Sequence, residues 1–294
     1  MSSRFPETRI AIIGGDAREA YLAESLAGAG FFVQVFGPRP PQRQNIVLCE
    51  TLRHALEGAR AAILPAPGIN EKGELYCPFL EKPLLVGEGD LGVLPRGTPV
   101  FVGVAGAYLK NLASRLDLKL IELLDLDEVA ILNSIPTAEG AVWLAMGKLP
   151  VTIHGSRCFV LGFGRTGQTL AALLAAMGAQ TTVVARNPAQ RARALQMNCR
   201  ACDFSELPEL VGNAEIIFNT VPALVLDEKV LARVSPEALI VDLASSPGGV
   251  DCAAAGRLGL TAFLAPGLPG KIAPKTAGQI LSRVIGKLLA EYFA

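Results

Sequence analysis

The sequence predicts an α/β protein with two Rossmann-like domains, each a doubly wound parallel sheet, joined by a linking helix. The first observation behind this prediction is the alternation of short apolar segments with Ala-rich helical stretches, which is typical of parallel sheets covered by helices. The second is the length of 294 residues, which corresponds to about two domains. The third is a glycine-rich turn in the middle of the chain, which opens a second series of strands and helices.

The composition fits a globular protein and excludes several function classes. Hydrophobic residues make up 51% of the chain and charged residues 18%, so disorder is excluded. Lys and Arg together number 27, as do Asp and Glu, which leaves no basic excess to bind a nucleic acid backbone. Gly, Pro or charge interrupts each apolar run within about 10 residues, short of the ~20 needed to span a membrane. The N-terminus leads into a strand rather than a signal peptide, so we expect a cytoplasmic protein.

Cysteine and histidine chemistry is not expected. The six cysteines are scattered, and a chain with an ample core does not need disulfides, so reduced thiols are predicted. Cys199 and Cys202 form a CxxC, but the chain has neither a second pair for zinc nor the context of a thioredoxin motif, and no metal site is predicted. The two histidines are His54 and His154. None follows His154, so the late histidine base of 2-hydroxyacid dehydrogenases is not expected.

The first domain is predicted over residues 1–134 and is expected to hold the substrate. After its first strand comes the helix Ala17–Ala27, which is apolar at helical spacing and is closed by Gly28. The predicted strands of this domain are Arg9–Ile13, Phe32–Phe36, Ala61–Leu64, Val100–Val104 and Lys119–Leu123.

The linking helix is predicted over residues 135–149 and the second domain, which should bind the cofactor, over residues 150–273. Pro136 at the helix start, an acid in the first turn and Lys148 in the last turn fit the polarity of a helix. Residues 274–294 are long enough for about five helical turns, and in one topology this helix packs back on the first domain. The predicted strands of the second domain are Arg157–Leu161, Thr181–Ala185, Glu215–Asn219, Leu239–Leu243 and Thr261–Leu264.

The strongest local signal is the sequence GFGRTG, which follows the strand RCFVL and opens a helix. In such a turn Gly162 permits a tight bend, Gly164 lets a pyrophosphate approach, and Gly167 lets the helix pack against the sheet. The first helical turn, at Arg165 and Thr166, then offers N–H groups to the phosphates. The motif predicts dinucleotide binding.

The end of the next strand predicts NADP rather than NAD. NAD-binding domains carry Asp or Glu about 20 residues after the glycines, where it accepts a hydrogen bond from the ribose 2′-hydroxyl. Here the strand runs into Arg186 and Asn187, and Arg191 follows. A guanidinium suits the 2′-phosphate of NADP; the alternative is a solvated arginine at a strand end.

Two further loops are predicted to flank the cofactor because they follow strands at the carboxyl edge of the sheet. One loop contains Thr220, Val221 and Pro222, and the other contains Asp242 and Ala244. The alternative for both is an ordinary loop rich in Pro and Gly.

The first domain begins like a nucleotide site but departs from it. Its first strand is followed by Gly14 and Gly15 and then by Asp16, which would repel phosphates, so no second cofactor is expected. Asp16 and Arg18 suit a small substrate with amine-like and carboxylate groups; the alternative is a helix cap with a surface arginine. The other candidate substrate-binding or catalytic residues are Pro67, Gly68, Thr137, Glu139 and Lys275.

Five segments together resemble the family of dipicolinate synthase A subunits, which make the pyridine dicarboxylate of the spore core. The segments are IGGDAR at 13–18, SIPTAEGA at 134–141, GFGRTG at 162–167, DLASSPGGVD at 242–251 and APGLPGKIAPKTAGQIL at 265–281. The resemblance covers nearly the whole chain, and the last segment is more specific than the glycine motif. Ser246 stands where the family often has a basic residue, which weakens the case for a carboxylate-binding side chain in that loop.

The resemblance implies an NADP-dependent oxidation of hydroxytetrahydro- or dihydrodipicolinate to dipicolinate in the mother cell of a sporulating bacterium. It also implies a flavoprotein-like partner, the B subunit of dipicolinate synthase, and we expect a homo-oligomer whose size the sequence does not give. Since the product is aromatic, catalysis can rest largely on positioning. In this interpretation Arg18 and Lys275 hold substrate carboxylates, and Glu139 or Asp16 assists proton loss. The alternatives are another NADP-dependent dehydrogenase or imine reductase of an amino-acid-derived substrate, and a non-catalytic NADP-binding regulatory subunit.

Overall fold

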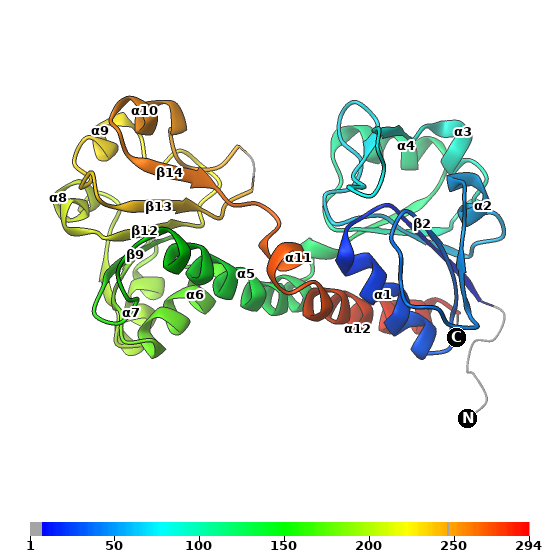
Figure 1. Cartoon of the computed structure of the whole chain (residues 1–294), viewed down its shortest axis with the longest axis horizontal. Coiled ribbons are helices and arrows are strands. Elements are labelled where there is room, and N and C mark those ends of the chain that lie inside the picture. The colour runs from blue at the N-terminus through cyan, green and yellow to red at the C-terminus, as the bar shows by residue number, and fades with distance from the viewer. Residues whose placement is uncertain (1–7, 246, 294) are drawn as a thin grey trace. The chain divides into compact units, whose positions relative to one another are not determined.

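The computed structural model describes residues 8–245 and 247–293, so Ser246 lies outside the described residues. The chain divides into two compact units: unit 1 contains the residues up to 132 and those from 273 onward, and unit 2 contains residues 133–272. In each unit, helices cover both faces of a six-stranded sheet (Figure 1). The predicted fold class, two doubly wound parallel-sheet α/β domains, is therefore confirmed.

The sheet of unit 1 has the strand order β3-β2-β1-β4-β7-β8, and all of its strand pairs are parallel. Its central strands are built almost entirely of buried apolar residues, because helices cover both faces. A short antiparallel hairpin, β5-β6, follows β4. The strands are β1 (Arg9–Ile13), β2 (Phe32–Phe36), β3 (Ile46–Leu48), β4 (Ala61–Ile63), β5 (Glu74–Leu75), β6 (Leu84–Leu85), β7 (Pro99–Val102) and β8 (Lys119–Glu122).

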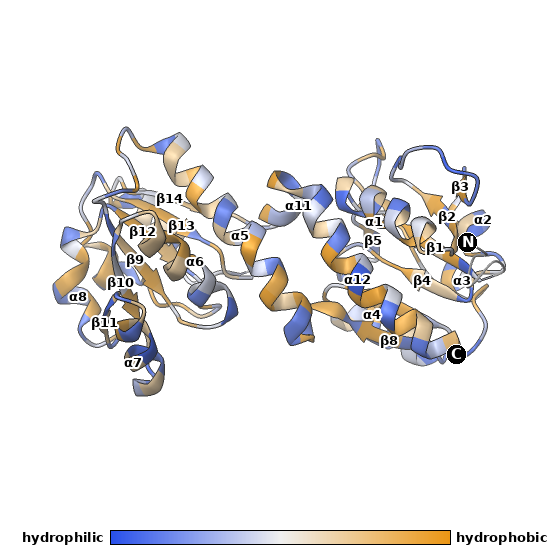
Figure 2. Cartoon of the chain, turned by 90° about the horizontal axis from the view of Figure 1, so that it is seen from below, coloured by the Kyte–Doolittle hydropathy of each residue, from blue (hydrophilic) through white to orange (hydrophobic). Residues whose placement is uncertain are grey.

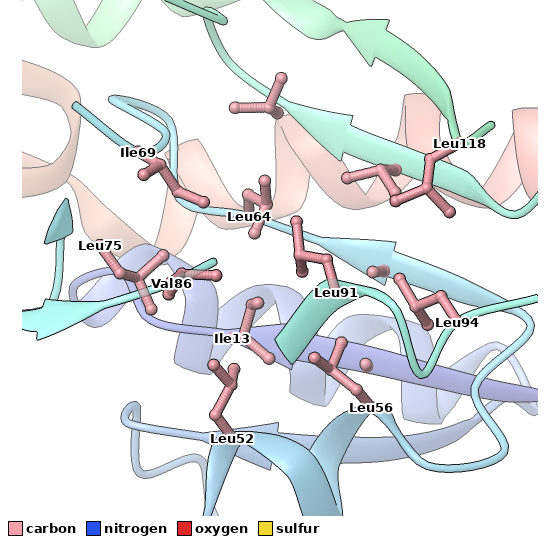
Figure 3. Packing of buried hydrophobic residues seen from close by; sticks show 14 of the residues in the cluster. Ile13, Leu52, Leu56, Leu64, Ile69, Leu75, Val86, Leu91, Leu94 and Leu118 are labelled. Atoms are coloured by element: carbon pink, nitrogen blue, oxygen red, sulfur yellow. The ribbon is translucent and has the colours of Figure 1, made fainter. Parts of the chain in front are cut away.

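Two layers of helices enclose this sheet. One face packs against α1 (Ala17–Gly28) and α12 (Pro274–Phe293), and the other against α2 (Leu52–Leu56), α3 (Glu88–Leu91) and α4 (Ala107–Arg115). Figure 3 shows part of the second layer, where Leu52 and Leu56 of α2 and Leu91 of α3 lie around Ile13 of β1. The α12 helix lies so close to α1 that a Cβ built on Gly278 would come within 2.5 Å of the carbonyl oxygen of Arg18.

Unit 2 repeats the plan with the strand order β11-β10-β9-β12-β13-β14, again all parallel. Figure 2 shows that hydrophobic residues concentrate in the strands. The strands are β9 (Arg157–Leu161), β10 (Gln180–Val184), β11 (Arg200–Cys202), β12 (Ile216–Asn219), β13 (Leu239–Asp242) and β14 (Thr261–Leu264). The helices are α6 (Arg165–Ala176), α7 (Pro188–Gln196), α8 (Leu207–Leu210), α9 (Glu228–Leu231), α10 (Cys252–Arg257) and α11 (Leu268–Ile272).

The helix expected to start at Pro136 begins nine residues earlier, so that prediction was wrong: α5 runs over Asp127–Lys148, and Pro136 lies inside it. Proline lacks the N–H that would bond the carbonyl four residues back, which disfavours this position. Pro136 is buried, and the neighbouring Thr137 hydroxyl donates a hydrogen bond of 2.8 Å to the carbonyl of Asn133. Among the described residues, α5 is also the one helix long and apolar enough to cross a membrane, and 44% of its most apolar window is buried inside the protein.

The predicted strands all occur, with ends shifted by at most two residues. The prediction missed β3 and β11, which have three residues each, and the hairpin β5-β6, whose strands have two. Segments this short carry too few residues to show an alternation or an apolar run.

Candidate functional site

Each sheet has one point at its carboxyl edge where the strand order reverses direction, and open α/β sheets bind ligands at such points. In unit 1 this point lies between β1 and β4, and in unit 2 between β9 and β12. The glycine turn follows β9, and the candidates Asp16 and Pro67 follow β1 and β4. The glycine turn, Asp16 and Pro67 therefore lie beside the switch points, whereas Arg186 follows β10, Asp242 ends β13 and Glu139 lies on α5.

The glycine turn of unit 2 leaves space for a phosphate group. Gly162 has a φ of +88°, and a Cβ on it would lie 2.6 Å from the hydroxyl of Thr220. A Cβ on Gly167 would collide with the carbonyl oxygen of Gly162, so the helix packs tightly against the turn. A Cβ on Gly164 would meet no atom within 4 Å. Two glycines thus permit the shape of the turn, and the third keeps the space in front of α6 open.

Asp242, at the end of β13, connects the two loops beside this turn. Its buried carboxylate accepts hydrogen bonds from the Asn219 side-chain amide (2.8 Å), the Ala244 N–H (3.1 Å) and the Gly249 N–H (2.7 Å). Asn219 also binds the backbone N–H and carbonyl of Val221, each at 3.0 Å. Both oxygens of Asp242 are thus bound to protein donors, and the residue holds the two loops in place rather than offering its carboxylate to a ligand.

Thr220 faces inward as well, because its hydroxyl donates to the carbonyl of Leu161 at 2.8 Å. In the same loop Val221 is half-buried and Pro222 is exposed. The apolar side chain of Val221 and the ring of Pro222, rather than the threonine hydroxyl, are the parts of this loop that a ligand could touch.

The basic residues after β10 differ from one another in their contacts. Arg186 is exposed, and Asn187 caps α7 by accepting a hydrogen bond from the Ala189 N–H at 2.9 Å. Arg191 is bound within the protein: its Nη1 donates to the carbonyls of Ala185 (2.7 Å) and Arg186 (2.8 Å). The side chain of Arg186 is therefore the one that projects into solvent at the strand end.

In unit 1, the glycines of the first turn pack closely against other protein groups. A Cβ on Gly14 would lie 2.8 Å from the Leu75 side chain, and the Gly15 N–H donates to the carbonyl of Tyr76 at 2.7 Å. The carboxyl of Glu19 lies directly against Gly15. The backbone of this turn is therefore held by the hairpin and by Glu19.

Asp16 and Arg18 form a bidentate ion pair at the start of α1. Arg18 donates from Nε and from Nη2 to the two carboxylate oxygens of Asp16, each at 2.9 Å. Burial alone would raise the pKa of Asp16, but the hydrogen bonds and charge of Arg18 outweigh it and lower that pKa. Asp16 also caps α1 through the Arg18 N–H, and its own N–H donates to Glu19 at 2.8 Å, which completes a capping box.

Glu19 was missed by the sequence reasoning. Its side chain is almost wholly buried, and burial raises its pKa to about 7, with Arg18 opposing and Asp16 reinforcing the change. The signal that could have found it is the spacing of Asp16 and Glu19, three residues apart at a helix start. Glu19 is the acid at this edge whose protonation changes in the physiological range.

Lys275 lies on α12, the helix that packs against α1. It occupies the first turn of α12, about one turn before Gly278, which contacts the backbone of Arg18. A lysine at a helix N-terminus is disfavoured by the helix dipole. The packing of Gly278 on Arg18 thus brings the N-terminal turns of α1 and α12 to the same end of unit 1.

Pro67 and Gly68 border a hollow of about 390 Å³ that the hairpin β5-β6 also lines. Its polar residues include Asn70, Glu74 and Tyr76. The volume lies in the range of small-molecule sites. Of the remaining candidates, Thr137 is used within α5, and Glu139 is exposed on that helix.

The two thiols of the CxxC lie on opposite faces of the unit 2 sheet, in separate hydrophobic clusters. Burial raises the pKa of Cys202 to about 11. Within residues 8–245 and 247–293, no cluster of three or more His, Cys, Asp or Glu side chains could hold a metal ion.

Comparison with known proteins gives matches to both halves of the chain. A family model described as the N-terminal domain of the dipicolinate synthase A subunit matches residues 9–124. A second, described as the NAD binding domain of D-isomer specific 2-hydroxyacid dehydrogenase, matches residues 136–248. The second match identifies the cofactor class as a nicotinamide dinucleotide.

Three of the relatives that match along most of the chain are described as A subunits of dipicolinate synthase. The dipicolinate synthase A subunit of Bacillus subtilis (strain 168) is 40% identical over 264 residues, which is 89% of each chain. The crystal structure of the dipicolinate synthase A subunit from Bacillus halodurans has a TM-score of 0.92 at 34% identity, covering 97% of this chain and 99% of that one. The Bacillus subtilis structure has a TM-score of 0.88 at 38% identity, covering 99% and 98%.

Proposed function

Because the chain belongs to the family of dipicolinate synthase A subunits, we propose that it is an NADP-dependent oxidoreductase that forms dipicolinate from a hydroxytetrahydro- or dihydrodipicolinate. A partner protein, the B subunit of dipicolinate synthase, works with it, and the reaction takes place in the mother cell of a sporulating bacterium. In this proposal unit 2 binds the cofactor and unit 1 binds the substrate.

The observation that carries the proposal is the open turn at Gly164, with the exposed Arg186 at the end of the next strand. The pyrophosphate would lie on the N–H groups of the first turn of α6, where the helix dipole favours an anion. Arg186 would pair with the 2′-phosphate of the adenosine ribose. No acid takes the position after β10 at which NAD-binding domains hold the ribose.

When bound, the nicotinamide accepts a hydride. Oxidation of a dihydropyridine removes one hydride and one proton from the ring and leaves an aromatic product, with one NADP reduced per dipicolinate formed. The hydroxytetrahydro form must first lose one water molecule to give the dihydro form. The aromaticity gained supplies much of the driving force, and the residues of the chain need mainly to orient the substrate and accept a proton.

The substrate carries two carboxylates, and unit 1 offers two cations for them. Arg18 binds Asp16 through Nε and Nη2 and is 7% exposed, and in this proposal a substrate carboxylate reaches it at Nη1. Lys275, on the helix that packs against Arg18, is exposed and would bind the other. The N-terminal dipoles of α1 and α12 strengthen the attraction.

Asp16 and Glu139 remain our candidates for the proton acceptor, and Glu19 joins them. The pKa of Asp16 is lowered, which makes its carboxylate a weak base, whereas burial raises the pKa of Glu19 to about 7. A general base is most effective when its pKa lies near the working pH, which favours the Asp16–Glu19 pair as the route for the proton.

The test is nicotinamide reduction by the purified chain, supplied with NADP and freshly generated product of dihydrodipicolinate synthase, with and without the partner protein. NADPH and dipicolinate appearing in step is the expected result. The absence of NADPH under both conditions, with NADP bound tightly, would instead favour a regulatory role.

Variants separate the two sites. Arg186→Ala is expected to lower the ratio of NADP to NAD affinity by at least about tenfold, the loss of a charge-assisted contact worth roughly 1.4 kcal/mol. Lys275→Ala is expected to raise the KM for the substrate, whereas the matched variant Lys287→Ala, which removes an exposed lysine elsewhere on α12, leaves KM unchanged. Equal KM values for the two lysine variants would remove Lys275 from the substrate site.

A further inference from the structure

An acid does lie beside the end of β10, on the neighbouring strand rather than on β10 itself. The strands β10 and β11 are parallel, with Val184 opposite Cys202, and the Ala185 N–H donates to the Cys202 carbonyl at 3.1 Å. Asp203 therefore stands next to Ala185 at the carboxyl edge of the sheet. This is the edge at which NAD-binding domains place the acid that holds the ribose.

Arg191 connects this acid to the loop after β10. Its Nη1 donates to Asp203 Oδ2 at 2.7 Å and also to the carbonyls of Ala185 and Arg186 at 2.7 and 2.8 Å. The guanidinium of Arg191 thus holds the backbone carbonyl before Arg186 and the carbonyl of Arg186 itself. The Arg191 side chain is 27% exposed and that of Asp203 36%, so the pair lies at the surface where a ribose phosphate would approach.

We propose that Arg191 and Asp203 set the cofactor preference of the chain, with Arg191 acting as a positioning residue and Asp203 as an acid whose charge Arg191 neutralises. The inference rests on the proposed binding of the 2′-phosphate by Arg186 and deepens it. Arg191 holds the loop so that Arg186 is presented to the phosphate, and it prevents Asp203 from repelling that phosphate.

The negative charge of Asp203 explains why Arg191 is needed to neutralise it. Hydrogen bonds from the N–H and hydroxyl of Ser205, together with Arg191, lower the pKa of Asp203, so its carboxylate is ionised at neutral pH. A carboxylate beside a phosphate dianion is repulsive, whereas beside a ribose 2′-hydroxyl it is an acceptor. Without Arg191, Asp203 would therefore disfavour NADP and tolerate NAD.

The experiment measures the dissociation constants of NADP and NAD by calorimetry for the full chain, without substrate. The variants are Arg191→Ala, Asp203→Asn and the double variant. Arg193→Ala is the matched control, since Arg193 is an exposed arginine on the same helix whose Nη1 lies 3.3 Å from the Gln196 side-chain oxygen. Thermal unfolding and circular dichroism verify that each variant is folded. Asp203→Asn keeps Arg191 and its contacts to the loop.

For Arg191→Ala we expect NADP to bind at least about tenfold more weakly and NAD to change by less than about threefold, tenfold being about 1.4 kcal/mol. Adding Asp203→Asn to that variant is expected to restore NADP affinity by at least about threefold, because the uncompensated charge is gone. The Arg193→Ala control is expected to change neither constant by more than about twofold.

Equal weakening of NADP and NAD by Arg191→Ala would make the arginine merely structural and overturn the proposal. A double variant no better than Arg191→Ala would remove Asp203 from it. These failures differ from failure of the proposed cofactor site, which would show as a wild-type chain without preference for NADP, or as no loss of preference in Arg186→Ala.

Discussion

Replacing the buried Glu19 by glutamine is expected to change how the stability of unit 1 depends on pH. Burial raises the pKa of this carboxyl from its ordinary 4.5 to about 7, so the folded chain holds a proton that the unfolded chain has already released. Stability from this group is therefore present below the unfolded pKa and is lost as the pH rises through the folded value. At about 1.36 kcal/mol per pKa unit, the wild type loses about 3 kcal/mol over this interval.

Glutamine does not titrate, so Glu19→Gln lacks that loss. The unfolding free energy of the variant relative to the wild type should rise by about 3 kcal/mol between about pH 5 and about pH 8. Asp16 acts in the opposite sense but at lower pH. Its pKa is lowered, so its contribution is lost as the pH falls below its ordinary value of 3.8, outside the interval measured.

The assay is urea unfolding at the two pH values, and the chromophores report the units separately. All four tyrosines lie in unit 1, and the one tryptophan, Trp143, lies in unit 2. Tyrosine fluorescence should record the pH-dependent difference while tryptophan fluorescence does not. Glu24→Gln, which removes a half-buried charge from the same helix, is the control. If Glu19→Gln differs from wild type by the same amount at both pH values, the assignment of Glu19 as the proton-holding acid is refuted.

Other variants probe unit 2 and the thiols. Gly164→Ala is expected to weaken NADP binding by about tenfold or more, because the added Cβ would face the phosphate. The melting temperature should not change, since this Cβ meets no protein atom within 4 Å. Unchanged NADP binding would contradict the open turn. Gly162→Ala should lower the unfolding free energy of unit 2 by about 2 kcal/mol. The reasons are that φ is +88° at this residue and that the added carbon collides with the hydroxyl of Thr220. A variant with the urea midpoint of the wild type would contradict this prediction. Asp242→Ala leaves buried N–H donors unpaired and should destabilise unit 2 by about 3 kcal/mol in the same urea assay. A thiol reagent should label the exposed Cys252 in the native chain. Cys158 is buried and has a pKa of about 12, so it should react only after unfolding. Mass spectrometry of the labelled peptides distinguishes the two cysteines.

The elements that could be predicted are those whose pattern is local. The central strands are continuous apolar runs because both faces are covered, and GFGRTG has its shape imposed by three glycines. The start of α5 was mispredicted because proline is typical of the first turn of a helix, whereas here Pro136 is buried within the helix. Short strands such as β3 are defined by their neighbours in the sheet.

For the candidate site, too, the sequence predicted where residues lie relative to the strands but not which distant residues they contact. Sequence reasoning placed Arg186 and Thr220 directly after strands, with Arg191 a few residues further on, and the structure has all three there. It could not tell that Thr220 binds the Leu161 carbonyl, because that partner is 59 residues away. It also found no acid near the ribose position, since Asp203 reaches that edge only through the pairing of β10 with β11.

The return of α12 to unit 1 has a consequence for the order in which the chain can fold during synthesis. Leu281, Val284, Ile285 and Leu289 belong to the same buried cluster as Ile10 and Leu22, so that cluster is incomplete until the last helix has been made. Unit 2, in contrast, is one continuous stretch that ends at residue 272. Domains usually complete in the order of translation, but here the second unit can close on the ribosome while part of the apolar surface of the first stays uncovered until α12 emerges. During that interval α1 and its sheet face are the surface that a chaperone would have to protect.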